Sequence, residues 1–280
     1  MSEELKFDVK THFQFGANWE EYSRSIREID IKRSETALCR LLGVETLKGQ
    51  SFLDIGCGSG IHSLAALRLG ADSVQAIDID ERSVACAQEL VKTHWDKPNF
   101  DAEVGNVFEL DAARSRRYDV VYSWGVLHHT GDMWGAVDAA AKQVQPGGLF
   151  AIALYRKTPC CGFWKIEKKF FAGASPTVRK LLVYTYAGMR MLGDLVRLKD
   201  PTRRWRRPKS ASRGMKWYTD VVDWLGGYPY ESATPDEVRE FVEARGFKQL
   251  ASFKTKTDLG VFGSGNAEYR FRAAEHHEAP

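Results

Sequence analysis

Cysteine is scarce in this sequence, and its few occurrences lack the spacing of a disulfide framework or a metal site. The 280 residues contain five cysteines, an odd number: Cys39, Cys57, Cys86, Cys160 and Cys161. None of them forms the paired spacing that zinc ligands show. A disulfide-stapled secreted domain is therefore disfavoured, and we expect free thiols in a reducing cytoplasm.

Long apolar runs are also missing. No window of about 18 residues is free of charge, so we expect no transmembrane helix. No basic N-terminal stretch precedes an apolar core, so we expect no secretory signal. Charged residues make up 28% and hydrophobic residues 44% of the chain, which is ordinary for a soluble globular protein with a large core.

Three glycines at alternate positions follow an apolar run that ends in an acidic residue. Residues 52–60 read Phe-Leu-Asp-Ile-Gly-Cys-Gly-Ser-Gly. Glycine permits sharp turns and close approach of backbone to a ligand, and the N–H groups that begin a helix over residues 61–69 would face the same ligand. A loop that serves only packing is one alternative. A dinucleotide site is another, but its Gly-x-Gly-x-x-Gly pattern fails because position 61 is Ile.

A second apolar run, residues 73–77, is closed by Asp78. The spacing fits a β-α-β unit of about 30 residues, in which an acidic side chain at the tip of the second strand accepts hydrogen bonds from a ribose diol. The alternative is that Asp78 and Asp80 are ordinary solvated carboxylates of a loop.

Further strand patterns follow at regular intervals. Residues 101–104 end at Gly105-Asn106-Val107, residues 118–123 run into Trp124, and residues 149–155 follow the turn at 146–148. Five strands alternate with helical segments, which predicts an α/β fold with a doubly wound, mainly parallel sheet.

In this order the segments resemble the class I S-adenosylmethionine-dependent methyltransferases, in particular the small-molecule branch of the ubiquinone and menaquinone methyltransferases. The stretch Asp-Ile-Gly-Cys-Gly-Ser-Gly at 54–60 is similar to the family's first signature. The resemblance covers residues 36–155 and resumes with a last helix from Thr234 toward Phe247 and a strand at 267–272. It implies a Rossmann-like sheet of seven strands with an antiparallel last strand.

The resemblance also implies a cofactor, S-adenosylmethionine, with S-adenosylhomocysteine as product and no metal. The glycine loop would hold the methionine end with support from Asp54, Asp78 would hold the ribose, and Ile79 would pack on the adenine. The family more often has Asp where Asn106 stands, and an amide oxygen can still accept from an exocyclic amine. The full set of implied cofactor contacts is Asp54, Gly56, Cys57, Gly58, Gly60, Asp78, Ile79, Asn106, Val107 and Ser123.

The N-terminal residues 1–35 depart from a minimal member of this family. Aromatic residues concentrate there, and Phe15, Trp19 and Tyr22 would form a lid that excludes water and touches cofactor or substrate. The alternative is that these rings only fix a helix to the sheet.

Residues 156–231 are a second departure, inserted before the closing segment 232–280, and they predict a helical cap. Residues 151–220 hold 17 Lys and Arg against 4 Asp and Glu, a net charge of +13 in a chain whose total is +3. A helix is expected over 176–198, with Arg179, Arg190 and Arg197 on one face, followed by a basic turn at 203–207. Another face would be apolar, through Val178, Leu182, Met189, Leu192 and Val196.

The charge of this basic cap has several interpretations. An anionic substrate or carrier, an anionic membrane surface and a nucleic acid would each be attracted to it, and a solvated face paired with the acidic core is the alternative. Nucleic acid is disfavoured because Ser-Trp-Gly-Val at 123–126 replaces the Asn/Asp-Pro-Pro motif of methyltransferases that act on base amines.

Candidate substrate contacts lie in the loops that follow the strands. The loop at 223–231 mixes aromatic rings, glycines and carboxylates above the carboxyl ends of the strands, where ligands bind in such folds. Its candidates are Tyr228, Tyr230 and Glu231, joined by Trp124 after the fourth strand. The alternative is a rigid structural turn.

Candidate general bases are His128 and His129, with Tyr155 as a weaker one. A base adds only about 10²- to 10⁴-fold, so catalysis by alignment alone is also consistent with the pattern. The Glu-x-x-Glu-His arrangement of metal-dependent quinone methyltransferases is replaced by Gly-Val-Leu-His-His at 125–129. His276 and His277 belong to a polar tail and are not expected to be metal ligands.

We therefore expect a cytoplasmic methyltransferase, monomeric or homodimeric, that moves a methyl group to oxygen or nitrogen of a small or medium-sized metabolite. The alternatives are a lipid-linked or macromolecular anionic substrate at a membrane or on RNA, and an inactive cofactor-binding partner protein.

Overall fold

The computed structural model describes residues 16–110 except 24, residues 117–200 except 197 and 199, residue 202, and residues 217–254 and 265–275. Phe15, Arg197, the basic turn at 203–207 and both tail histidines lie outside these residues.

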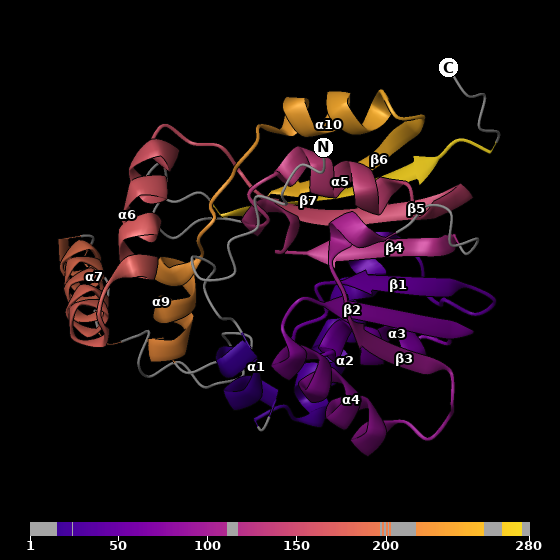
Figure 1. Ribbon diagram of the computed structural model, residues 1–280, viewed down its shortest axis with the longest axis horizontal. Helices are drawn as coiled ribbons and strands as arrows, with labels where there is room; N and C mark the ends of the chain where they lie inside the picture. The colour runs from indigo at the N-terminus through magenta and orange to yellow at the C-terminus, as the bar shows by residue number, and fades with distance from the viewer. Residues whose placement is uncertain are drawn as a thin grey trace, which may run out of the picture.

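A seven-stranded sheet runs through the described part of the chain with the order β3-β2-β1-β4-β5-β7-β6 (Figure 1). Pairing is parallel from β3 to β5, and β7 is antiparallel to both β5 and β6. The predicted doubly wound fold with a reversed last strand is confirmed. The strands are β1 Ser51–Ile55, β2 Ser73–Asp78, β3 Phe100–Val104, β4 Tyr118–Trp124, β5 Val144–Tyr155, β6 Phe247–Lys254 and β7 Asn266–Ala273.

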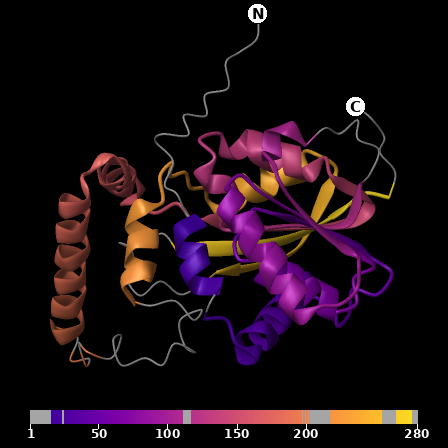
Figure 2. The same ribbon diagram turned by 60° about the horizontal axis from the view of Figure 1, so that its bottom comes forward.

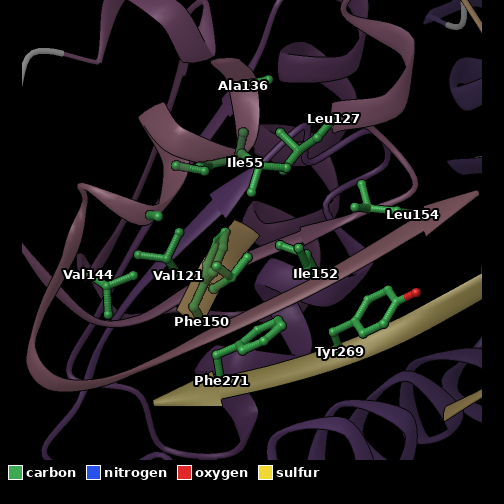
Figure 3. Close-up of a cluster of buried hydrophobic side chains, with 14 of the residues drawn as sticks. Ile55, Val121, Leu127, Ala136, Val144, Phe150, Ile152, Leu154, Tyr269 and Phe271 are labelled. Atoms are coloured by element: carbon green, nitrogen blue, oxygen red, sulfur yellow. The ribbon is translucent and has the colours of Figure 1, made fainter. Parts of the chain in front are cut away.

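Helices cover both faces of the sheet. One face carries α2 Glu28–Leu42, α3 Ile61–Arg68 and α4 Glu81–His94; the other carries α5 Met133–Ala141 and α10 Pro235–Glu243 (Figures 1 and 2). Successive strand residues point to opposite faces, so Phe52 packs with α2 and α3 while Leu53 joins the cluster under α5 and α10. Figure 3 shows the second cluster, in which Ile55, Val121, Phe150 and Phe271 gather from four strands.

Local signals fix several helix ends. Asp80 accepts a hydrogen bond from the Arg82 N–H and caps α4. Thr234 and Glu237 form a reciprocal capping box at the start of α10, where Pro235 occupies the first turn. The capping box explains why the last helix begins where the sequence predicts.

The start of β5 differs from the prediction. The strand begins at Val144, which pairs with Tyr118, and not at residue 149. The Pro-Gly-Gly sequence at 146–148 lies within the strand and does not precede it. The register of the pairing with β4 shifts there, between Tyr118 and Val120. Gly147, with φ of +74°, takes up that irregularity.

The inserted segment follows the carboxyl end of β5 and forms a layer of helices beside that edge of the sheet (Figures 1 and 2). Its helices are α6 Cys161–Gly173, α7 Pro176–Val196 and α9 Trp217–Gly226. They share a small core of their own that includes Trp164, Phe171, Val183, Tyr186 and Leu225.

The buried side of α7 is formed by residues outside the predicted apolar stripe. Val183, Tyr186, Ala187 and Asp194 are the buried residues of this helix. Within the stripe, Val178 and Leu182 are half-buried, and Met189, Leu192 and Val196 are exposed. Arg179 and Arg190 lie on the partly buried side, where Arg179 donates to the Phe171 carbonyl and Arg190 to the Tyr186 hydroxyl.

Within the described residues, no helix combines the length and apolar character that crossing a bilayer requires. The same part of the chain holds no group of three or more His, Cys, Asp or Glu side chains arranged to bind a metal ion.

Candidate functional site

The glycine loop between β1 and α3 is fastened to the end of β2. The N–H groups of Gly56 and Cys57 donate to the Ile77 carbonyl at 2.8 and 3.0 Å. The Gly58 N–H donates to Oδ2 of Asp78 at 2.9 Å. The three glycines have φ of +76°, +54° and +77°, a region that side chains rarely enter. The loop is therefore a rigid backbone turn at the carboxyl edge of the sheet.

Gly60 ends this loop where α4 leaves no room for a side chain. A Cβ at Gly60 would lie 2.6 Å from the Cα of Ala87, which is backbone and cannot yield like a flexible side chain. Gly49 has nearly the same φ, +79°, yet a Cβ there would meet nothing within 4 Å. The two positions separate the cost of the backbone conformation from the cost of the clash.

We expect Gly60→Ala to lower the free energy of unfolding by about 2–4 kcal/mol, because backbone strain and overpacking add. Gly49→Ala should cost only about 1 kcal/mol, because strain acts alone. Urea denaturation of both variants measures the difference. Equal losses at the two positions would contradict the close contact between the loop and α4.

Trp19 of α1 (Gly16–Ser23) lies against the glycine loop. A Cβ on Gly58 would come within 2.9 Å of Cε2 of its indole ring. Tyr22 is buried and meets Trp19 edge to face, with ring centroids 5.9 Å apart. The structure thus places one predicted lid residue, Trp19, against the loop and a second, Tyr22, against Trp19.

Asp54 lies buried behind the loop at the end of β1. Its Oδ2 accepts a hydrogen bond of 2.6 Å from the Ser63 hydroxyl, which ties the strand to the first turn of α3. Burial raises the pKa of Asp54 to about 7; the Ser63 hydrogen bond opposes this rise and the nearby Asp78 adds to it. The carboxyl group is therefore about half protonated near neutral pH.

This shift predicts a stability that depends on pH. The pKa is about 7 in the folded chain and 3.8 ordinarily, so the folded state keeps a proton that the unfolded state releases. The resulting stabilisation is complete below pH 3.8 and is lost as the pH rises through 7, by at most about 4 kcal/mol. Asp54→Asn keeps an acceptor for Ser63 but has no proton to lose. Its free energy of unfolding, compared with wild type by urea denaturation from pH 5 to 8, should fall less; parallel curves would contradict the assignment.

Asp78 stands at the tip of β2, as the sequence predicts. Besides Gly58, it accepts from the Asp80 N–H through Oδ1 at 3.0 Å. Burial raises its pKa, and these two backbone donors oppose the rise. The next residue, Ile79, exposes 48% of its surface, so its side chain is open to a flat ligand.

The other predicted cofactor contacts also have structural partners. The Asn106 side chain accepts from the Phe108 N–H and caps a short 3₁₀ helix, Val107–Glu109. The Val107 side chain is buried in the core, so only its backbone is available to a ligand. The Ser123 hydroxyl donates to the Ile55 carbonyl at 2.9 Å. Burial raises the pKa of the Cys57 thiol well above its ordinary range, so that thiol is neutral.

The histidines lie on a second 3₁₀ helix, Leu127–His129, after β4. His128 is fully buried, with its ring centroid 3.9 Å from that of Tyr155 and 4.3 Å from that of His129. Neither of its ring nitrogens has a hydrogen-bond partner among the described residues. Burial, helped by His129 and Lys168 and slightly opposed by the Ala153 backbone, holds the pKa of His128 well below 6.5. His128 is therefore neutral near pH 7.

His129 is half-buried and is oriented by the backbone. Its Nδ1 lies 2.7 Å from the Pro229 carbonyl oxygen, which can only accept. Nδ1 therefore carries a hydrogen, and in the neutral ring the lone pair resides on Nε2. This tautomer is the one that a proton acceptor needs.

Aromatic rings continue this cluster into the cap. Tyr155 lies 5.2 Å from Tyr230 and 5.8 Å from Trp224, measured between centroids. Lys168 of α6 is fully buried over the Trp224 ring and donates to the Trp224 carbonyl oxygen. Sequence reasoning missed Lys168. Its one signal is its register with Trp164, four residues earlier on the buried face of α6.

The remaining substrate candidates have structural roles that the sequence does not reveal. Glu231 accepts from the Met133 N–H at 2.9 Å at the start of α5, and burial raises its pKa. The Trp124 indole donates to Glu268 of β7 at 2.9 Å. Tyr228 is half-buried in the loop that follows α9.

The loop and the histidine cluster form one continuous site. Val126 immediately precedes the histidine turn, and a Cβ on Gly56 would lie 2.3 Å from its Cγ2. The loops that follow β1 and β4 are therefore in contact at the same edge of the sheet. A ligand on the glycine loop would lie near the proton-accepting and aromatic side chains that follow Val126.

Comparison with known proteins supports this picture. Residues 53–152 match the family described as methyltransferase domain. A ribosomal protein L11 methyltransferase from Ruminiclostridium cellulolyticum is 34% identical over 115 residues, which cover 37% of this chain and 36% of that protein. A ubiquinone biosynthesis O-methyltransferase from Methylobacterium sp. (strain 4-46) is 34% identical over 118 residues, 42% of this chain and 45% of that protein. The chain thus spans less than half the length of these curated relatives.

Solved structures match over more of the chain. The magnesium protoporphyrin IX methyltransferase ChlM from Synechocystis PCC 6803, crystallised with bound SAM, has a TM-score of 0.57 and 14% identity, covering 97% of this chain and 100% of that one. At this identity the match concerns the fold alone.

Proposed function

We propose that this chain is a class I S-adenosylmethionine-dependent methyltransferase that transfers a methyl group to an oxygen or nitrogen atom of a small or medium-sized metabolite. One observation carries the proposal: the glycine loop held by Asp78 is in contact with Val126, the residue before the turn that carries His128 and His129. The cofactor and a proton acceptor would thereby share one edge of the sheet.

The residues present fit the cofactor. Each Asp78 oxygen accepts one backbone hydrogen bond and retains a second lone pair for a ribose hydroxyl. The exposed Ile79 side chain offers an apolar surface to the adenine, and the amide of Asn106 lies at the tip of the neighbouring strand. The glycine loop would receive the methionine end, next to the buried Asp54 and below Trp19.

The bound cofactor supplies a sulfonium-activated methyl group, which a nucleophile displaces in line. The protein contributes alignment first, worth about 7–11 kcal/mol when the reactants are held in attack geometry. His129 would accept the proton of the acceptor group on Nε2, because Pro229 fixes its other nitrogen as the donor. The neutral His128 ring adds no positive charge that would oppose this protonation.

We infer the shape of the substrate from the ring cluster. The rings of Tyr155, Trp224 and the buried Tyr230 pack together beside the histidines. Such a wall fits a flat or apolar acceptor with a phenolic, carboxylic or amine nucleophile. Tyr228 and Glu231 would adjoin it from the loop after α9.

A lipid-linked or macromolecular anionic substrate is the second candidate, favoured by the net charge of +13 over residues 151–220. Such a substrate would reach the site along the basic cap, in a cytoplasmic protein that also touches a membrane surface. We expect the protein to be a monomer or a homodimer.

Incubation with S-adenosylmethionine labelled on its methyl group tests the proposal. The acceptor panel should contain free phenols, carboxylic acids and amines, together with lipid-linked versions of each. We expect label in a free metabolite. Transfer only to the lipid-linked acceptors would favour the second candidate. Tight cofactor binding without transfer to any acceptor would favour a cofactor-binding partner protein.

A further inference from the structure

The outer face of α7 is apolar. Six of its large hydrophobic side chains expose between 54% and 77% of their surface: Leu181, Tyr184, Met189, Leu192, Leu195 and Val196. An apolar stripe on a helix normally faces the core of the protein. Here Val183, Tyr186 and Ala187 form the inward side of the helix instead. The exposed stripe therefore lies on the surface of the folded chain.

These six side chains form one continuous band, the α7 face. At 100° per residue they fall within an arc of about 140°. They extend over the 16 residues from Leu181 to Val196, which is about 24 Å at 1.5 Å per residue. A contiguous apolar band of this length marks an interaction surface more often than a chance exposure.

The neighbouring helix α6 shows the same pattern on a smaller scale. Phe163, Ile166 and Phe170 recur at spacings of three and four residues and are each more than half exposed. Its opposite side packs through Trp164, Lys168 and Phe171. Two consecutive helices of the basic cap thus present apolar side chains to the outside.

On both helices the exposed charges are positive and the acidic groups are buried. The exposed charged residues of α6 and α7 are Lys165, Lys169 and Lys180, all positive. The two acidic residues are withdrawn from the surface: both carboxylate oxygens of Glu167 are buried, and Asp194 is buried. The surface therefore combines apolar side chains with positive charge and shows no exposed negative charge on these helices.

This combination fits an anionic lipid bilayer. A helix that lies in the plane of a membrane places its apolar side in the headgroup boundary and its lysines beside anionic lipids. The acidic remainder of the chain, which carries −10 outside residues 151–220, would face away from the lipid. In both views α7 lies at the outer edge of the molecule, farthest from the sheet, so the core does not obstruct a flat surface (Figures 1 and 2).

We propose that the α7 face docks the protein on an anionic lipid bilayer. The helix lies in the headgroup plane without crossing the membrane, and Lys169 and Lys180 contact the lipid headgroups. The inference depends on the surface alone and not on methyl transfer, so it can fail or hold separately from the proposed function. Docking would bring the cap, and with it the site, close to acceptors that reside in the membrane.

Flotation of the full chain with vesicles tests this docking. Vesicles of phosphatidylcholine alone are compared with vesicles that contain 30% phosphatidylglycerol, at low and at physiological salt. We expect binding to the anionic vesicles that weakens as salt rises. Leu192→Asp/Val196→Asp should reduce the partition coefficient by at least about 20-fold, because two apolar anchors become acidic. Replacement of both Lys169 and Lys180 by Gln should reduce it about fivefold per lysine.

A matched control uses exposed apolar residues of the core domain. Ile29→Asp/Leu250→Asp makes the same chemical change at side chains exposed by 46% and 40%, away from the cap, and should bind as wild type. Both double variants should keep wild-type melting temperatures, since the four residues are exposed. Equal binding to neutral and anionic vesicles, or undiminished binding by the α7 variant, would overturn the proposal. So would a dimer that lacks vesicle affinity and dissociates on the α7 substitution, because the face would then belong to a second copy.

Discussion

Asp78→Ala should weaken the binding of both S-adenosylmethionine and S-adenosylhomocysteine by at least about 100-fold. Two losses combine in this substitution. The ribose would lose a charged acceptor, and the Gly58 and Asp80 N–H groups would lose the carboxylate that holds the loop in place. Hydrogen bonds to charged groups contribute about 1.5–3 kcal/mol each, so two of them account for the expected factor. Calorimetric titration measures the change in the dissociation constant.

Asp80→Ala is the matched control for this prediction. It removes an aspartate two residues away, and with it the cap that accepts from the Arg82 N–H. A lost cap costs about 1 kcal/mol of stability but leaves the loop fastened to Asp78. Cofactor affinity should therefore stay within threefold of wild type. Equal losses in the two variants would show that Asp78 acts only by general electrostatics.

His129→Asn should lower kcat/KM for methyl transfer by about 10²- to 10⁴-fold while leaving the affinity for cofactor unchanged. The asparagine amide can still donate to the Pro229 carbonyl, so the local hydrogen bond is retained. What disappears is the ring nitrogen that would accept the proton. The rate is measured with the labelled methyl donor and the acceptor that the screen identifies.

His94→Asn provides the control, because His94 lies in the last turn of α4, outside the site. It should transfer methyl groups at the wild-type rate. If His129→Asn kept more than a tenth of the wild-type kcat/KM, alignment alone would drive the reaction and the turn at 127–129 would serve only to shape the site.

Much of the core could be predicted from the sequence because its signals are local. The apolar runs and the glycines that follow them predicted the strands, and the capping residues predicted the last helix. The start of β5 escaped prediction because Pro146 and the two glycines after it usually end a strand, whereas here an irregular pairing accommodates them.

The cap was harder to predict because its packing is tertiary. Periodicity located α7 correctly, but it did not show which side of the helix is buried, since Val183 and Tyr186 belong to a second apolar stripe. Lys168 was hidden among the 17 positive charges of its region. The place of Glu231 and Asn106 in the fold led to their prediction as ligand contacts. Only the structure shows that their side chains accept hydrogen bonds from the backbone of Met133 and Phe108.

Calorimetric titration of the purified wild-type chain with S-adenosylmethionine and with S-adenosylhomocysteine tests the central claim most directly. The structure predicts one site per chain, with micromolar dissociation constants for both ligands and none for a nicotinamide dinucleotide. A folded protein that binds neither ligand, or that prefers the dinucleotide, would contradict the assignment of the glycine loop and Asp78 to this cofactor.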